Sequence, residues 1–199
     1  TSDESFKAAA SGRPDLSRAR YQRIKRLVNQ AIDAYPRPTH LLLPELSLPE
    51  RWVDTVSRLL HDAGISLIAG LDYHHGKKPD IHSEAVLVLA DDRLGFPSSV
   101  QIRQAKSLPA VGEEETLLST FGLEWPSHLA GVRKPVYNHG GFCFGVLVCS
   151  ELQNIAHRQQ FQGNVDCMMV LSWNLDLETF AALVESASLD VHAHIALVN

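Results

Sequence analysis

The chain has 199 residues, of which 45% are hydrophobic and 21% charged, the balance of a soluble globular protein with one sizeable core. Its formal net charge of −5 does not favour a nucleic-acid-binding surface. No apolar run approaches the roughly 18 residues that a membrane span requires. Three cysteines, an odd number, argue against a disulfide framework and for a reducing compartment, so we expect a cytoplasmic protein.

Two regions differ in composition. Residues 1–17 are small and polar, and we expect them to form an arm or linker, whereas residues 18–199 are expected to form one domain. The chain begins with Thr1 rather than Met, so we also expect it to be a segment of a longer polypeptide.

An amphipathic helix is predicted over residues 18–34, with Asp15 or Ser17 as its cap. Its apolar residues recur at spacings of three and four: Tyr21, Ile24, Leu27, Val28, Ala31 and Ile32. Its basic residues fall mostly on the opposite face: Arg18, Arg20, Arg23, Lys25 and Arg26. We interpret that face as solvated rather than as a phosphate-binding patch.

A short strand, Thr39–Leu43, follows and should end there, because Pro44 cannot donate to a central ladder. Glu45 is therefore expected in the loop just beyond the strand. A helix over residues 50–63, stopped by Gly64, and an apolar strand over residues 65–71 come next. This alternation predicts a layered α/β fold with mainly parallel neighbours.

The middle of the chain carries a loop, a hairpin and a long irregular segment. The loop at residues 72–82 contains three histidines without a recognisable metal-ligand spacing, and we interpret it as an exposed loop rather than a metal site. Strands at residues 84–90 and 98–103 are predicted to form a hairpin. The segment 107–135, long and weakly periodic, is typical of functional loops.

The last third of the chain begins with a buried strand, residues 142–148, that ends at Cys149. A helix over 154–162, a buried strand over 165–171, a helix over 177–192 and a strand from residue 195 are predicted after it. A thiol at the end of a buried strand lies at the rim of a sheet, where open α/β folds keep their sites.

Three reactive groups thus follow predicted strands: Glu45, Lys106 and Cys149. Each also has a structural interpretation. Glu45 could favour a helix N-terminus, Lys106 could be a solvated surface residue, and Cys149 could be a buried packing residue.

In this order the three groups resemble the nitrilase superfamily of carbon–nitrogen hydrolases. Leu43-Pro44-Glu45 is similar to the family's Pro-Glu segment, and Ala105–Pro109 followed by Gly112-Glu113 is similar to its lysine region and second-glutamate loop. The run Val146–Glu151 resembles its nucleophile strand. The resemblance extends from about Tyr21 to Asn199 and implies a nitrilase-like α-β-β-α sandwich, incomplete at both ends and lacking the C-terminal strands.

The resemblance implies an amidase or nitrilase mechanism without metal or organic cofactor. Cys149 would be the nucleophile, Glu45 the general base, and Lys106 the oxyanion stabiliser, helped by the backbone N–H of Ser150. The second, positioning glutamate would be Glu113, with Glu114 as the alternative. Trp173 and Asn174, at the tip of the next strand, would line the pocket.

The remaining cysteines, Cys143 and Cys167, are interpreted as packing residues, and Glu151 as a member of a structural ion pair. An aromatic residue often follows the family's cysteine, but Ser150 stands there in this chain. A catalytically silent nitrilase-like domain, serving assembly or effector sensing in a larger protein, is therefore the alternative to an enzyme. A thiol redox protein is less favoured, because the chain has no Cys-x-x-Cys pair.

Partner predictions follow from the same resemblance. The expected ligand is a small-molecule amide or nitrile. We also expect a homo-oligomer and a fused partner domain, with no membrane and no nucleic acid among the partners.

Overall fold

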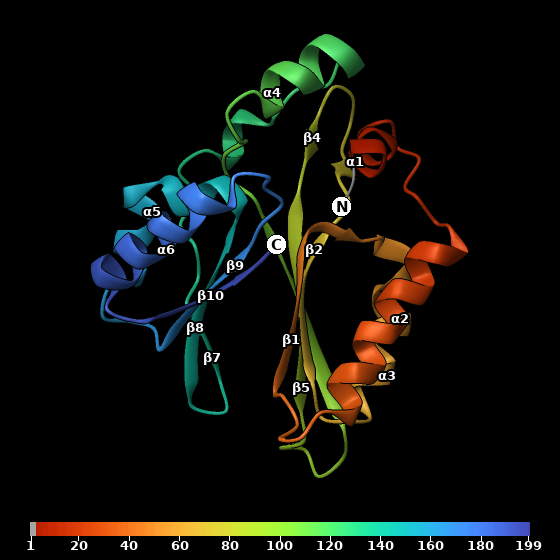
Figure 1. Cartoon of the computed structure of the whole chain (residues 1–199), viewed down its shortest axis with the longest axis vertical. Coiled ribbons are helices and arrows are strands. Elements are labelled where there is room, and N and C mark those ends of the chain that lie inside the picture. The colour runs from red at the N-terminus through yellow and green to blue at the C-terminus, as the bar shows by residue number, and fades with distance from the viewer. Residues whose placement is uncertain (1–2) are drawn as a thin grey trace. The chain divides into compact units, whose positions relative to one another are not determined.

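The computed structural model describes residues 3–199, which divide into two compact units (Figure 1). The first unit holds the described residues up to His74 together with Ser83–Gln104, and the second holds His75–His82 and Ala105–Asn199. Each unit contains helices and one four-stranded sheet. The expected α/β class is therefore confirmed.

The first unit contains, in chain order, α1 (Asp3–Ala10), α2 (Arg18–Asp33), β1 (His40–Leu48), a 3₁₀ turn (Glu50–Trp52), α3 (Val53–His61), β2 (Ser66–Leu71), β5 (Glu84–Asp91) and β6 (Ser98–Ala105, its last residue belonging to the second unit). The strand order is β1-β2-β5-β6. β1 and β2 are parallel, as expected, whereas β2 and β5 are antiparallel. β5 and β6 are neighbours, which confirms the predicted hairpin.

The core of this unit lies between its sheet and helices α2 and α3, which lie side by side in Figure 1. Helix residues at spacings of three and four lie on one face of each helix, and alternate strand residues lie on one face of the sheet. These two faces pack against each other in the core. The buried members are Ile24, Val28 and Ala31 from α2, Val53, Val56 and Leu60 from α3, and Leu43, Leu48, Leu67, Ala69, Leu71, Val86 and Val88 from the strands.

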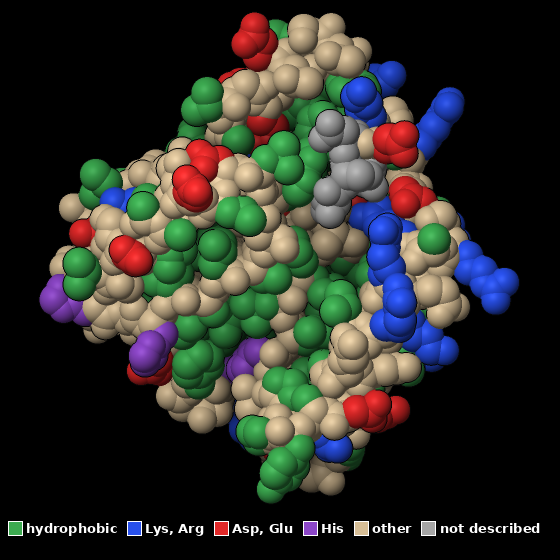
Figure 2. Space-filling model, viewed as in Figure 1, with side chains coloured by type: hydrophobic (Ala, Val, Ile, Leu, Met, Phe, Trp, Pro, Cys, Tyr) green, Lys and Arg blue, Asp and Glu red, His purple; other side chains and the backbone are tan. Residues whose placement is uncertain are grey.

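Helix α2 begins where the sequence predicted. Its basic residues are solvated as predicted, except for one. Ser17 is the N-cap, and its side chain accepts a hydrogen bond from the backbone N–H of Arg20. Most of the basic side chains are exposed, and Figure 2 shows Lys and Arg side chains gathered over this helix. The prediction was wrong for Arg20, which is only 6% exposed and forms an ion pair with Asp72 at 2.9 Å.

Strand β1 runs further than predicted. Its regular pairing with β2 stops at Leu43, where Pro44 follows, but the strand continues and pairs again at Leu48. Glu45 therefore lies inside an irregular part of the strand rather than in a loop. The reason is a bulge-like register shift, which lets a strand pass a proline without losing its direction.

The N-terminal region contains a helix that the sequence analysis did not predict. Residues 1–2 of the expected arm lie outside the described residues, whereas α1 places Ala9 and Ala10 in buried positions. The Phe6 ring meets the Tyr73 ring edge-on at 5.7 Å. The boundary between arm and domain at residue 17 stays a prediction.

The second unit contains β4 (Ile81–His82), α4 (Glu113–Thr116), a π-helical turn (Leu117–Phe121), a 3₁₀ turn (Ser127–Leu129), β7 (Tyr137–His139), β8 (Phe142–Val148), a 3₁₀ turn (Cys149–Gln153), α5 (Ile155–Phe161), β9 (Cys167–Leu171), α6 (Leu177–Val191) and β10 (His194–Val198). β4 pairs with the short strand β3 (His74–His75), which falls where the chain passes between the units. The predicted strands and helices of the last third are confirmed to within a few residues.

The sheet of the second unit has the order β10-β9-β8-β7, with β8, β9 and β10 parallel. Helices α5 and α6 contact each other, and α6 also contacts β10 (Figure 1). A Cβ atom added at Gly145 of β8 would lie 2.4 Å from the Phe161 ring of α5. The Phe161 ring thus packs directly on the backbone of β8, and a side chain at position 145 would require the ring to shift.

Candidate active site

Glu45 lies in the irregular part of β1, in the first unit. Its Oε1 accepts a hydrogen bond from the Ser83 hydroxyl at 3.3 Å, and its side chain is 3% exposed. The next residue, Leu46, has a φ of +53°, a left-handed conformation that is costly for a branched residue. Arg20 donates from Nη2 to the carbonyl oxygens of Leu46 at 2.9 Å and Ser47 at 3.0 Å, which stabilises the segment in this shape.

Lys106 directly follows β6 and belongs to the second unit. Its side chain is 1% exposed, and its ammonium group donates to Glu113 Oε2 at 2.7 Å. The same oxygen accepts the backbone N–H of Ala110 at 2.6 Å. The ammonium group also lies 5.5 Å from the centre of the Trp125 ring, within cation–π range.

Cys149 directly follows β8 and is the first residue of the 3₁₀ turn. Its φ of +48° is left-handed, a conformation that a non-glycine residue adopts only when its surroundings hold it there. The thiol lies 3.8 Å from the Trp173 carbonyl oxygen, and the Ser172 hydroxyl lies 3.8 Å from the sulfur. The strand end thus presents the thiol to the end of the neighbouring parallel strand β9.

Trp173, Asn174 and Ser150, the other predicted residues near Cys149, each have different contacts. Trp173 meets the Cys149 thiol through its backbone, as described above. Asn174 instead pairs with Asn199, donating its backbone N–H to that side chain at 2.7 Å and accepting from it at 2.8 Å. The Ser150 hydroxyl donates to the Leu108 carbonyl oxygen at 3.3 Å, which links the turn after β8 to the segment after Lys106.

Glu151 forms the ion pair that the sequence analysis predicted. Its Oε1 lies 2.6 Å from the Lys134 ammonium group, and both side chains are buried. The same oxygen accepts from the backbone N–H and the hydroxyl of Ser107, while Oε2 accepts the backbone N–H of Val148. His157 approaches the Ser107 hydroxyl at 3.3 Å, and burial lowers the pKa of its imidazole.

The predicted residues therefore divide between the units. Lys106, Glu113, Cys149 and Trp173 belong to the second unit, where the structure joins Lys106 to Glu113 and Cys149 to Trp173. Glu45 belongs to the first unit, and its role toward the others stays a prediction. Of the two candidate second glutamates, Glu113 contacts Lys106, whereas Glu114 is exposed.

Sequence reasoning missed two residues of this region. Ser172 precedes Trp173 at the same strand tip, and its position there was the available signal. Trp125 stands in the long irregular segment, where no periodicity marks it as a neighbour of Lys106.

The two other cysteines differ in exposure. Cys167 is buried in β9, and burial raises the pKa of its thiol, which fits the predicted packing role. Cys143 is only partly buried, and its sulfur accepts from the Asn138 amide at 3.3 Å. Packing therefore describes Cys143 less well.

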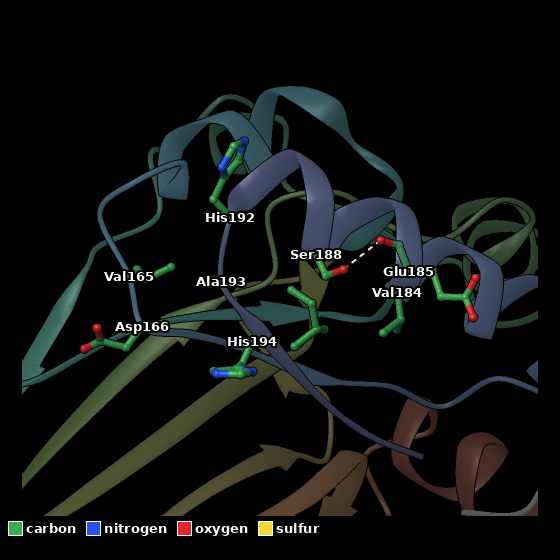
Figure 3. Close-up of a pocket in the computed structure, with 9 residues that line it drawn as sticks. Val165, Asp166, Val184, Glu185, Ser188, His192, Ala193 and His194 are labelled. Atoms are coloured by element: carbon green, nitrogen blue, oxygen red, sulfur yellow. Dashed lines mark hydrogen bonds between the residues drawn. The ribbon is translucent and has the colours of Figure 1, made fainter.

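A surface hollow of about 810 Å³ lies elsewhere in the second unit, between α6 and the starts of β9 and β10 (Figure 3). Figure 3 shows His192 and His194 on either side of it, with Asp166 at its edge and the Ser188 hydroxyl donating to the Glu185 carbonyl oxygen. None of the predicted site residues lines this hollow.

Residues 3–199 contain neither a metal-binding cluster nor a membrane-spanning helix. No group of three or more His, Cys, Asp and Glu side chains among them is arranged to hold a metal ion, and His74 and His75 are exposed. Within the same residues, no helix combines the length and the apolar character needed to cross a membrane.

Comparison with solved structures identifies the fold. The chain is similar to an amidase from Nesterenkonia sp., with a TM-score of 0.64 and 18% identity over 90% of this chain and 70% of the amidase. A cysteine-to-serine variant of the Nesterenkonia AN1 amidase, described as belonging to the nitrilase superfamily, gives a TM-score of 0.65 at 16% identity over 90% of this chain and 71% of that one. The resemblance seen in the sequence is thus confirmed, and the chain has the nitrilase fold.

A third structure shows the chemistry of that neighbour. In a glutamate-to-glutamine variant of the same amidase, the acetamide moiety of fluoroacetamide is covalently added at the active-site cysteine; the TM-score is 0.65 at 16% identity, over 90% of this chain and 70% of that one. No protein-family model and no curated protein matches the sequence of this chain.

Proposed function

We propose that the chain hydrolyses non-peptide carbon–nitrogen bonds of small amides or nitriles through Cys149. The observation that carries this proposal is the placement of Cys149. It directly follows a buried strand, has a left-handed conformation, and contacts the residues that follow the neighbouring strand β9. The solved neighbours of the same fold are amidases with an active-site cysteine, which supports the proposal.

In the proposed acylation step, Glu45 takes the proton of the Cys149 thiol, and the sulfur attacks the amide carbon. A thiol near its ordinary pKa is mostly protonated at neutral pH, so attack depends on such a base. The carbonyl oxygen then carries the negative charge, and Lys106 with the backbone N–H of Ser150 would stabilise it. The carbon–nitrogen bond breaks as Glu45 returns the proton to the leaving amine, and an acyl-thioester remains on Cys149.

In the proposed deacylation step, Glu45 removes a proton from a water molecule that attacks the thioester carbon. The same ammonium group and backbone N–H would stabilise the second oxyanion. The carbon–sulfur bond breaks, the carboxylic acid leaves, and the proton returns from Glu45 to the thiolate. No oxidant, reductant or cofactor enters this balance.

Three further residues receive supporting roles. Glu113, hydrogen-bonded to Lys106, would hold the ammonium group in place. Trp173 and Asn174 would line the substrate pocket. Because structures of the Nesterenkonia amidase hold acrylamide and butyramide, we propose small aliphatic amides as the substrates to test first. A homo-oligomer and a fused partner domain stay predictions.

The test follows the three thiols separately. We expect incubation with butyramide or acetonitrile to give an acyl adduct on Cys149 in the intact mass of the acid-quenched protein. We also expect iodoacetamide at pH 7 to label Cys149 at least tenfold faster than Cys143 or Cys167, as measured by peptide mass spectrometry. Glu45→Gln should slow labelling of Cys149, because the base is lost, and leave Cys143 unchanged.

Equal labelling of the three thiols in the folded protein would contradict the catalytic assignment of Cys149. Rapid Cys149 labelling without turnover of any amide or nitrile would instead favour the alternative, a catalytically silent domain. Retention of a binding partner by Cys149→Ala would strengthen that second outcome.

A further inference from the structure

The buried carboxylate of Glu151 is bonded to the residue after Lys106 and to the residue before Cys149. Glu151 Oε1 accepts from the Ser107 backbone N–H at 2.6 Å and the Ser107 hydroxyl at 2.7 Å. Its Oε2 accepts the backbone N–H of Val148 at 2.9 Å. One side chain therefore connects the chain positions next to two proposed catalytic residues, although Ser107 and Glu151 are separated by 44 positions in sequence.

Lys134 completes this arrangement from the other side. Its ammonium group lies 2.6 Å from Glu151 Oε1 and donates to the Ala105 carbonyl oxygen at 2.7 Å. Ala105 precedes Lys106 and Ser107 follows it. The backbone on both sides of Lys106 is thus bonded to one buried pair of charges, Glu151 and Lys134.

The energetics favour a positioning role over a stabilising one. Taking two charges out of water costs several kcal/mol for each ion, and their attraction repays this cost only with good geometry and further hydrogen bonds. A buried pair is therefore weak support for stability, because apolar residues of the same volume often do as well. Apolar residues, however, could not form the hydrogen bonds that Glu151 and Lys134 make to three backbone groups: the N–H of Ser107, the N–H of Val148 and the carbonyl of Ala105.

The conformation of Cys149 points the same way. Its φ of +48° is strained, and strained residues persist where the surroundings determine them from several directions. Val148 precedes Cys149, and its backbone N–H is bonded to Glu151, three positions further along the chain. The Glu151 side chain thus folds back across the nucleophile's own turn.

We propose that Glu151 and Lys134 form a positioning pair, which sets the Lys106 ammonium group relative to the Cys149 thiol. Neither residue would touch the substrate. The proposal deepens the proposed function, on which it rests for the roles of Lys106 and Cys149. On this proposal the buried pair is present because it fixes the geometry of the active site, since it contributes little to the stability of the fold.

The experiment measures the rate of Cys149 alkylation by iodoacetamide between pH 5 and 10, with peptide mass spectrometry to separate the three thiols. A nearby ammonium group favours the thiolate, so the midpoint of this pH profile reports whether Lys106 is in place. Lys106→Met sets the reference for its absence. The test variant is the double substitution Glu151→Gln with Lys134→Met, which removes both charges at similar volume.

We expect the double variant to unfold within a few degrees of the parent protein, since removing both partners leaves no unpaired buried charge. Its pH midpoint should rise toward that of Lys106→Met, and its kcat on butyramide should fall about a hundredfold with little change in KM, as a misplacement near 1 Å would cause. The matched control is Asp190→Asn, which breaks the Arg158–Asp190 ion pair of the same unit without touching the flanks of Lys106.

A folded double variant with the parent's pH midpoint would overturn the proposal. If the double variant does not fold, Ser107→Ala takes its place, because it removes one hydrogen bond to Glu151 and should raise the midpoint by a smaller amount; an unchanged midpoint there would equally overturn it. Absence of amide turnover in the parent protein would contradict the proposed function, while the pH profile would still decide the positioning role.

Discussion

Lys106 is a buried cation, and its burial requires a counter-charge. An isolated ammonium group inside a protein loses its hydration, so a carboxylate must replace it. Glu113 lies 2.7 Å from the ammonium group, whereas the neighbouring Glu114 is exposed on the short helix α4. The two glutamates, adjacent in sequence, therefore have different physical tasks.

This difference gives a paired prediction. We expect Glu113→Gln to lower kcat on a small amide about a hundredfold, because Lys106 loses the charge that holds it in position. Glu114→Gln should change kcat by less than about threefold, as is usual for an exposed substitution. Steady-state kinetics of both variants, with their thermal unfolding as a control for folding, would check it. A larger effect at Glu114 would exchange the two roles.

The irregular part of β1 is the element that presents Glu45. A Cβ atom added at Gly70 of β2 would lie 2.4 Å from the Glu45 Cα atom and 2.6 Å from the Pro44 carbonyl oxygen. These are backbone atoms, which cannot rotate away. The absence of a side chain at Gly70 therefore lets β1 approach β2 at the position of Glu45, while Arg20 holds the following carbonyl groups.

Gly70→Ala should accordingly shift the Glu45 segment. We expect a loss of about 1–3 kcal/mol in the free energy of unfolding from overpacking, together with slower labelling of Cys149 at pH 7. The control is Ala85→Gly at the residue paired with Gly70 across the sheet. It should cost about 1 kcal/mol or less and leave the labelling rate unchanged. If Gly70→Ala and Ala85→Gly were equally stable and their Cys149 were labelled at the same rate, Gly70 would have no special role in placing Glu45.

At the scale of the molecule, His157 is a source of pH-dependent stability in the second unit between about pH 5 and 7. Burial lowers the pKa of His157, while Glu151 raises it and Lys134 lowers it by a smaller amount. The unfolded chain then binds more protons than the folded one below the ordinary histidine pKa of about 6.5, so acid favours unfolding. Asp72 in the first unit acts in the opposite direction, because burial raises its pKa.

We therefore expect the free energy of unfolding to fall as the pH is lowered from about 6.5 toward the depressed pKa of His157. Urea denaturation at pH 7.5, 6.5 and 5.5 would measure the slope. His157→Gln keeps a polar side chain near the Ser107 hydroxyl but cannot gain the proton, so its stability should depend less on pH in this range. The same slope in both proteins would rule out His157 as the source.

The distribution of apolar residues along the chain was enough to predict most helices and strands. The runs that became β2, β8 and β9 are short and apolar, and α2 and α6 have the helical period, so local spacing alone identifies them. Glu45, Lys106 and Cys149 were proposed because all three follow predicted strands in an order that resembles the nitrilase superfamily.

Other features depend on residues far apart in the chain. The sequence pattern placed Arg20 on a solvated face, since nothing near it in sequence marks Asp72 as its partner. It ended β1 at Leu43, because the register shift that carries the strand past Pro44 depends on β2. It also interpreted Glu151 as a simple ion pair, whereas the carboxylate additionally bonds Ser107 and Val148.

The division has a physical reason. Hydrophobic period and turn chemistry act within a few residues, so the sequence by itself determined the α/β class and the order of the strands along the chain. The assignment of Glu45, Lys106 and Cys149 as reactive residues came from the family resemblance and stays a prediction. Buried charges are matched by long-range contacts, and strained backbone persists only where such contacts hold it. Only the tertiary structure therefore decided which carboxylate accompanies Lys106, why Gly70 is required, and how Glu151 and Lys134 together bond the residues next to Lys106 and Cys149.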